Sequence, residues 1–225
     1  LKLKTTEIHM SDFFVYIGTY TDTNSEGIYV YRLSMSNGRL SRVSSMSGIT
    51  NPSFLDVSPD RKFLYAIGEV DEMDGKPGGA AASYSIDEQR GTLTHLNTET
   101  TVGPGPCHLD IDRSGKYLLV ANYGGGSVAL LPIRKDGSLG AASGFIQHEG
   151  SSCNPNRQNE PHAHSIRVSP NNMHAFAPDL GLDRIMIYSI DLENGKLVYA
   201  DHPFIEVDPG EGPRHFDFHP NGRYA

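Results

Sequence analysis

Four stretches of the chain repeat one pattern of alternating apolar and polar positions. They occupy residues 51–58, 105–112, 162–169 and 212–219. In each stretch the fifth and seventh residues are apolar, so two apolar side chains lie on one face of a predicted strand. The third residue shares that face and serves as a marker: Ser53, Cys107, His164 and Arg214. The markers lie 54, 57 and 50 residues apart, and a strand-and-turn repeat of this length is typical of a β-propeller or a related array.

Apolar runs alternate with turn signals inside each repeat. In the second repeat the runs cover 108–111, 117–121, 128–133 and 144–147. Four short strands in up-and-down order make one propeller blade. No long stretch shows the 3.6-residue spacing of a helix. The pattern therefore predicts an all-β protein, a β-propeller of four-stranded blades, with full repeats at 51–103, 105–158 and 160–207.

Both ends of the chain depart from this repeat. The first blade, at 13–50, has only three candidate strands: 13–19, 27–33 and 40–46. Residues 211–225 offer only the start of another blade. Because a propeller protects its edges by closing into a ring, we expect the chain to be the N-terminal part of a longer protein and to be marginally stable alone. We expect residues 1–12 to be an extension, with Met10 as the natural start.

Composition narrows the classes of partner and compartment. The net charge is −8 and there is no run of Lys or Arg, which argues against nucleic acid or an anionic membrane as a partner. No apolar stretch approaches the roughly 20 residues of a membrane span. Two cysteines, Cys107 and Cys153, are too few to predict a disulfide framework, and the first nine residues lack a signal-peptide core. We therefore expect a cytoplasmic protein.

The marker positions are the first candidate site. They lie at the start of the innermost strands, where blades converge, so their side chains are expected to line a small pocket. His164 is a candidate base or proton shuttle, and Arg214 is a candidate to hold a carboxylate, a phosphate or an oxyanion. His162 precedes His164 by two residues and is expected on the same face. His215 and His108 occupy the adjacent column, which is expected to face a neighbouring blade.

A second polar column follows the second strand of each repeat. Its members are Gly68, Asn122 and Asp179, and the next column holds Glu69, Tyr123 and Leu180. The second strand runs antiparallel to the first, so these positions are expected at the same end of the channel as the markers. Asn122 and Asp179 are candidates for hydroxyl recognition, and Arg184 follows in the turn into the third strand.

Structural explanations stay open for several of these residues. A His-x-His pair is more often solvated or hydrogen-bonded than part of a site, and zinc would need a third ligand that the spacing does not supply, so no metal is expected. Arg214 could pair with Glu211. Cys107 is most simply a small buried residue.

Three ordered motifs carry a resemblance to a known family. They are Glu160–Pro170, Pro178–Arg184 and Gly212–Gly222, and Val15–Tyr20 and Ala121–Gly126 also fit. They resemble the propeller-type 6-phosphogluconolactonases over essentially all of 13–225. The resemblance implies a seven-bladed propeller, of which about four blades are present here in an incomplete ring. It also implies hydrolysis of 6-phospho-D-glucono-1,5-lactone, a small phosphorylated sugar lactone, in the pentose phosphate pathway, with no cofactor.

The resemblance also implies site residues. His164 and Arg214 would be catalytic, and His162, Asp179 and His215 are weaker matches to the family motifs. Arg184 is a candidate to hold the phosphate. The family places an acidic residue on the strand after the Gly-Pro-Arg-His motif, at a position five residues beyond Ala225. We therefore expect one catalytic carboxylate to lie outside this chain.

Two rival functions stay open. The family is related to a fungal enzyme that lactonises a muconate, so a lactonase or lactonising enzyme for another sugar acid or a muconate-type substrate is the first alternative. A non-catalytic propeller fragment that serves as a binding surface is the second. Hydrolysis of phosphorylated and plain gluconolactones would distinguish these functions.

Overall fold

The described part of the protein is built from strands, turns and loops. The structure is a computed structural model that describes residues 12–22 and 24–225, and this part contains no helix. The predicted extension at 1–12 lies, except for Asp12, outside the described residues, as does the predicted start at Met10. Among the described residues, no helix has the length and the apolar surface that crossing a membrane requires. The all-β class predicted from the pattern is confirmed.

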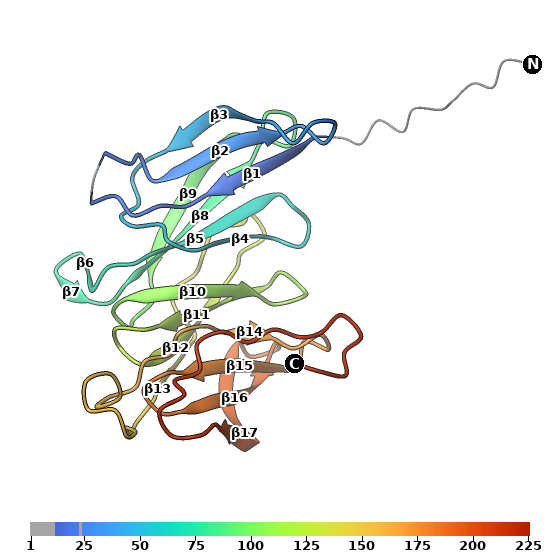
Figure 1. Cartoon of the computed structure of the whole chain (residues 1–225). Helices are drawn as coiled ribbons and strands as arrows, with labels where there is room; N and C mark the ends of the chain where they lie inside the picture. Colours follow the sequence, from blue (N-terminus) through green and yellow to red (C-terminus); the bar gives the residue numbers. More distant parts are fainter. Residues whose placement is uncertain (1–11, 23) are drawn as a thin grey trace, which may run out of the picture.

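Four larger sheets follow one another through the molecule (Figure 1). The first has three strands: β1 (Phe13–Ile17), β2 (Ile28–Leu33) and β3 (Leu40–Met46). The second has four: β4 (Leu55–Val57), β5 (Phe63–Gly68), β8 (Ala80–Ile86) and β9 (Leu93–Thr100). The third has β10 (Pro106–Ile111), β11 (Tyr117–Asn122), β12 (Ser127–Pro132) and β13 (Gly144–Gln147). The fourth has β14 (Arg167–Val168), β15 (His174–Asp179), β16 (Arg184–Asp191) and β17 (Lys196–Glu206).

Each four-stranded sheet is antiparallel, with its strands in sequence order. This is the up-and-down arrangement predicted for each repeat. A small hairpin, β6 (Glu72–Met73) with β7 (Lys76–Pro77), is inserted between β5 and β8 and was not predicted. It enlarges the loop that leaves the second strand of the second sheet.

The opening strands are shorter than the sequence pattern predicts. β14 covers only two residues of the predicted 162–169, although His164 N still donates to Pro178 O at 2.9 Å. Pro178 has no amide hydrogen to return, so the ladder between the opening segment and β15 is interrupted there. The stretch 212–219 forms no strand, because no described segment supplies a backbone ladder for it. The prediction of an opening strand at 212–219 is therefore wrong for the described residues.

The hydrophobic core lies between successive sheets rather than inside any one of them. One buried cluster joins the first and second sheets around Val30 and Tyr84, a second joins the second and third around Tyr65 and Leu131, and a third joins the third and fourth. Strands such as β11 are covered on both faces, which explains why they read as continuous apolar runs. The stacking of sheets face to face is what a propeller requires.

Asp110, at the repeated position of an opening strand, connects two neighbouring sheets. Asp110 Oδ2 accepts a hydrogen bond from Val168 N at 2.7 Å, across the boundary between the third and fourth sheets. Asp112, at the end of the same stretch, holds its own turn through the amides of Ser114 and Tyr117 and also accepts a hydrogen bond from Asn172 Nδ2, between β14 and β15, at 2.9 Å. Inter-sheet distances near the convergent strands are therefore fixed by charged hydrogen bonds as well as by packing.

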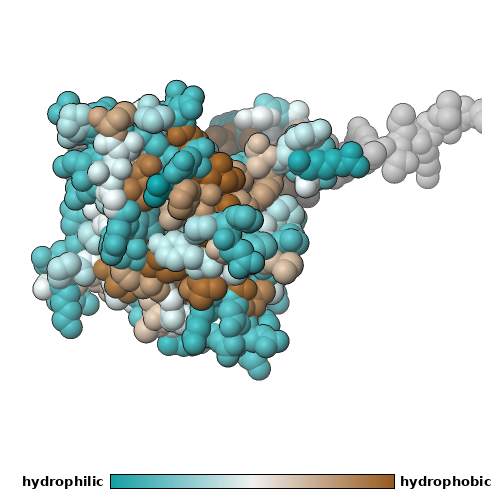
Figure 2. Space-filling view, turned by 90° about the horizontal axis from the view of Figure 1, so that it is seen from below, coloured by the Kyte–Doolittle hydropathy of each residue, from teal (hydrophilic) through white to brown (hydrophobic). Residues whose placement is uncertain are grey.

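Apolar side chains are exposed at the end of the stack formed by β14–β17. Figure 2 views the molecule from this end and shows apolar side chains gathered near its middle, among polar ones. Exposed apolar residues of this sheet include Val198, Tyr199 and Ile205. At the other end of the stack, β1 pairs only with β2 within the described residues.

Candidate active site

The marker residues meet where the opening segments of successive sheets converge. β10 packs between β4 and β14 (Figure 1). Cys107, in β10, donates its thiol to the backbone oxygen of His164 at 3.0 Å. The backbone oxygen of Arg214 accepts a hydrogen bond from Ser165 Oγ at 2.7 Å, so the fourth marker lies directly beside the third. The structure thus brings together the column that the repeat predicts.

His164 occupies the centre of this group. Its ring centroid lies 5.2 Å from that of His215 and 5.5 Å from that of Tyr123, both in edge-on contact. Nδ1 of His164 is buried and has no hydrogen-bond partner in the described part of the chain. Burial, followed by the positive charges of Arg214 and His215, lowers the pKa of His164, while Glu69 opposes this shift. The imidazole is therefore neutral near pH 7 and able to accept a proton.

Arg214 is available for a ligand. No ion pair joins it to Glu211 in the described residues, which removes the structural explanation left open for this side chain. The loop before Arg214 is held by Asp183, whose carboxylate accepts hydrogen bonds from Gly210 N and Gly212 N, both at 2.7 Å. The backbone that presents the guanidinium is thereby anchored to the turn after β15.

The other histidines divide between the site and the packing. His162 stacks on Tyr123 with ring centroids 4.6 Å apart, and its Nδ1 lies 3.1 Å from Tyr123 O. His215 contacts His164, whereas His108 is buried against Phe54 of the neighbouring sheet, with ring centroids 4.0 Å apart. Burial lowers the pKa of His108 to about 3. His108 is thus a neutral packing residue that faces a neighbouring sheet, as its column predicts.

Asn122 and Asp179, predicted to recognise hydroxyl groups, are both fully buried. Asn122 donates to Thr101 O and Ser127 Oγ. Asp179 accepts hydrogen bonds from His148 Nδ1 at 2.5 Å and from the backbone amides of His162 and Gly181. Their role as substrate contacts stays a prediction. Protein partners engage the Asp179 carboxylate and the Asn122 amide nitrogen, whereas Asn122 Oδ1 is buried and has no hydrogen-bond partner in the described residues.

The arginine beside the site is not the one that the sequence favoured. Arg184 donates to Glu206 at 3.1 Å and lies over the ring of Phe204 at 4.1 Å, on the outer strands. Arg157, which the pattern did not single out, donates to Tyr123 Oη at 2.9 Å and is exposed beside the site. It lies in the loop between β13 and β14, where the repeat has no counterpart and gives no signal.

The sequence columns placed Glu69 at the rim of the site but assigned it no role. Its Oε2 accepts hydrogen bonds from Ser53 Oγ and from Tyr20 Oη, the latter at 2.8 Å. Its position in the column with Tyr123 predicted that it rims the same end as the markers, and the structure confirms this. Tyr20 comes from the loop after β1, which no column indicated.

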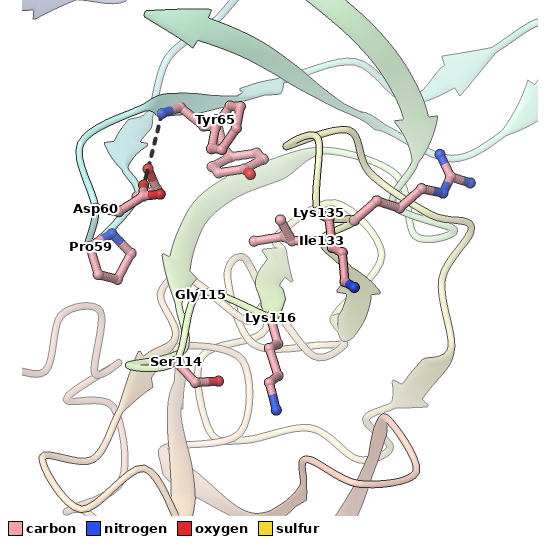
Figure 3. A pocket seen from close by; sticks show the side chains of 11 residues that line it. Pro59, Asp60, Tyr65, Ser114, Gly115, Lys116, Ile133 and Lys135 are labelled. Atoms are coloured by element: carbon pink, nitrogen blue, oxygen red, sulfur yellow. Dashed lines mark hydrogen bonds between the residues drawn. The ribbon is translucent and has the colours of Figure 1, made fainter. Parts of the chain in front are cut away.

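A cavity of about 260 Å³ lies at the other end of the sheets (Figure 3). It is lined by Pro59, Asp60, Tyr65, Lys116 and Lys135, among others. These residues surround the turns that precede β5 and β11, whereas Glu69 and Tyr123 follow the opposite ends of those strands. Because it lacks the histidines and Arg214, we assign the chemistry to the convergent end. In the described residues no group of three or more His, Cys, Asp or Glu side chains has a metal-binding arrangement.

Comparisons with known proteins agree with this architecture. The chain matches the family described as "Lactonase, 7-bladed beta-propeller" over residues 14–225. It is 36% identical over 217 residues to the 6-phosphogluconolactonase of Bacillus subtilis, covering 96% of this chain and 59% of that protein. The 6-phosphogluconolactonase of Formosa agariphila is 35% identical over 215 residues, with 94% and 60% covered. The solved structure of the periplasmic gluconolactonase of Pseudomonas aeruginosa matches with a TM-score of 0.86 at 36% identity, covering 95% of this chain and 60% of that one.

The stacked antiparallel sheets and the polar group at their convergent strands define a propeller-type protein with a single candidate site among the described residues. The chain belongs to the seven-bladed β-propeller lactonase family. It spans about three fifths of the length of the relatives named above.

Proposed function

We propose that the complete protein hydrolyses 6-phospho-D-glucono-1,5-lactone to 6-phosphogluconate, a step of the pentose phosphate pathway. The observation that carries this proposal is the proximity of a neutral, partly buried His164 to Arg214, whose guanidinium has no ion-pair partner in the described residues. Two relatives named 6-phosphogluconolactonase support the substrate. We further propose that the sheets are blades of a seven-bladed ring, with boundaries near 13–50, 51–103, 105–158, 160–207 and a further blade from 211.

The two groups divide the chemistry of ester cleavage. Arg214 polarises the lactone carbonyl and stabilises the oxyanion that forms as water attacks the carbonyl carbon. His164 removes the proton from that water. When the tetrahedral intermediate collapses, the bond from the carbonyl carbon to the ring oxygen breaks, and the proton returns to that oxygen to give the free hydroxyl of the acid. His162 and His215 flank His164 and are proposed to contact the substrate, whereas Asn122 and Asp179 act by positioning.

An unphosphorylated gluconolactone is the second candidate substrate. The gluconolactonase of P. aeruginosa is as similar to this chain as the phosphogluconolactonase of B. subtilis, at 36% identity each. Arg184, predicted to hold the phosphate, is instead engaged by Glu206. A cytoplasmic location stays a prediction, supported by two free thiols that suit a reducing compartment.

Substrate preference decides between these functions. We expect the complete protein to hydrolyse the phosphorylated lactone with a kcat/KM at least about tenfold above that for D-glucono-1,5-lactone, because a phosphate gains charge-assisted bonds from a cationic site. The rate of proton release at constant pH measures the hydrolysis of each lactone. Equal or reversed values would favour the unphosphorylated substrate, and no hydrolysis of either would favour a binding module.

The pH dependence of catalysis should report the depressed pKa of His164. Because the neutral imidazole is the base, kcat/KM should stay high as pH falls through 6.5 and decline only below it, at the lowered pKa. Replacing Arg214 by Gln removes a neighbouring positive charge, so the pKa of His164 should rise and the acid limb of the residual activity should move to higher pH. The profile of kcat/KM against pH measures this; an acid limb that does not move would contradict the electrostatic coupling of the two residues.

A further inference from the structure

Three polar side chains form a wall of the site that the proposed mechanism does not use. Glu69 directly follows β5, Ser53 precedes β4, and Tyr20 lies in the loop after β1. The two hydroxyl groups both donate to one carboxylate oxygen, Glu69 Oε2. We call these three residues the Glu69 cluster.

The backbone holds this cluster in place. Asn51 Oδ1 accepts hydrogen bonds from Thr21 N at 2.8 Å and from Thr21 Oγ1 at 3.1 Å, which fixes the loop that carries Tyr20. The amide of Glu69 donates to Asn51 O at 3.0 Å, and the Asn51 side chain donates to Glu69 O at 3.3 Å. These bonds connect the first and second sheets next to the Glu69 carboxylate. The loop and the carboxylate are therefore already ordered before a ligand binds.

The cluster lies at the same end of the convergent strands as the candidate catalytic groups. Ser53, which donates to Glu69, precedes β4, and β4 packs against β10, whose Cys107 donates to His164 O at 3.0 Å. The pKa of the Cys107 thiol is raised to about 12, first by burial and then by the negative charge of Glu69. The same charge acts on His164, in opposition to burial and to Arg214. Glu69 is only partly buried, so part of its side chain stays accessible at this end of the strands.

The hydrogen bonding of the cluster makes it a wall of acceptors. Both hydroxyl hydrogens are committed to Oε2, so Ser53 and Tyr20 can offer only oxygen lone pairs outward. Oε1 of Glu69 has no partner in the described part of the chain. Such a wall repels a phosphate or a carbonyl oxygen and attracts hydroxyl hydrogens, whereas Arg214 on another side of the site has the opposite preference.

We propose that the Glu69 cluster is a subsite that binds the hydroxyl groups of a polyhydroxylated lactone ring. This inference rests on the proposed function for its substrate class and deepens it. The substrate is thereby oriented with its carbonyl toward Arg214 and His164, and with its ring hydroxyls donating to Glu69.

Substrates that lack single hydroxyl groups test this subsite. In the complete protein, Glu69→Gln should lower kcat/KM for D-glucono-1,5-lactone on the order of 10-fold to 100-fold, because a hydrogen bond to a charged acceptor is lost. With at least one of the 2-, 3- and 4-deoxy lactones, the variant and the unmodified protein should agree within about twofold, since the contacted hydroxyl is already missing. Glu72→Gln is the matched control: it removes the same charge from an exposed hairpin residue and should leave all rates unchanged.

Two outcomes overturn the subsite: an unchanged rate in Glu69→Gln, or the same loss with every deoxy lactone. If the complete protein hydrolyses no lactone, the proposed function fails and the subsite is tested separately by calorimetric binding of the non-hydrolysable D-glucono-1,5-lactam. At least tenfold weaker binding by Glu69→Gln, but not by Glu72→Gln, supports it. Absence of lactam binding, or equal binding by all three proteins, overturns it.

Discussion

Replacing Arg214 by alanine in the complete protein should lower kcat/KM for its lactone on the order of 100-fold or more. The guanidinium is a cation at the convergent strands that no described carboxylate neutralises, so the oxyanion would lose a stabilising charge. His164→Gln should cost about as much, because it removes the proton acceptor while keeping a side chain between Tyr123 and His215. Initial rates at several substrate concentrations give kcat and KM for each variant.

The matched control for this loss is Arg39→Ala. Arg39 is an exposed residue beside a turn of the first sheet, and its removal should leave kcat/KM within about twofold. Unfolding midpoints of all variants should agree with that of the unmodified protein, which separates a chemical effect from a folding defect. A loss below about threefold in both Arg214→Ala and His164→Gln would remove these residues from the reaction.

Replacing Asp179 by alanine should destabilise the protein by about 3–5 kcal/mol. Its carboxylate is completely buried and accepts hydrogen bonds from His148 Nδ1, His162 N, Gly181 N and Leu182 N. Alanine would leave these donors without a partner and without access to water. Nε2 of His148 in turn contacts the hydroxyl of buried Tyr188, so the loss would extend into the core of the fourth sheet. Chemical denaturation measures the change in unfolding free energy.

Two further variants make the interpretation specific. Asp179→Asn keeps the shape but turns an amide group toward the same donors, so it should also be destabilising, by a smaller amount. Asp201→Ala removes an exposed carboxylate from β17 and should change stability by less than about 0.5 kcal/mol. If Asp179→Ala cost less than about 1 kcal/mol, the buried network would not hold the site loops.

Much of the architecture could be predicted from short-range pattern. Runs such as 117–121 are continuous and apolar because the sheets cover them on both faces, and glycine-rich turns separate them. The repeat also predicted that the markers Ser53, Cys107, His164 and Arg214 converge. A repeated unit places equivalent positions at equivalent radii, so a column in sequence becomes a cluster in space. Where one residue breaks the ladder, as Pro178 does, the predicted strand is too long.

The roles of the polar residues could not be predicted in the same way. Asn122 and Asp179 occupy a column that rims the site, yet neighbours from outside the column bury them. Ser127 accepts from the Asn122 amide, and His148 binds the Asp179 carboxylate. Arg157 and Arg184 differ for the same reason: an irregular loop brings the first to Tyr123, and Glu206 engages the second. Sequence columns indicate where a residue lies along a blade, but not which other side chain forms a hydrogen bond with it.

The sequence by itself determined an all-β repeat and the end of the sheets at which His164 and Arg214, the proposed catalytic residues, lie. It could do so because alternation and turn signals are local, and the repeat places equivalent positions together in space. Only the tertiary structure decided which polar groups are free. Tyr20 and Glu69 are 49 residues apart and belong to different sheets. Their hydrogen bond forms because the sheets stack, and it commits the Tyr20 hydroxyl hydrogen to Glu69, so that this group of side chains offers acceptors only.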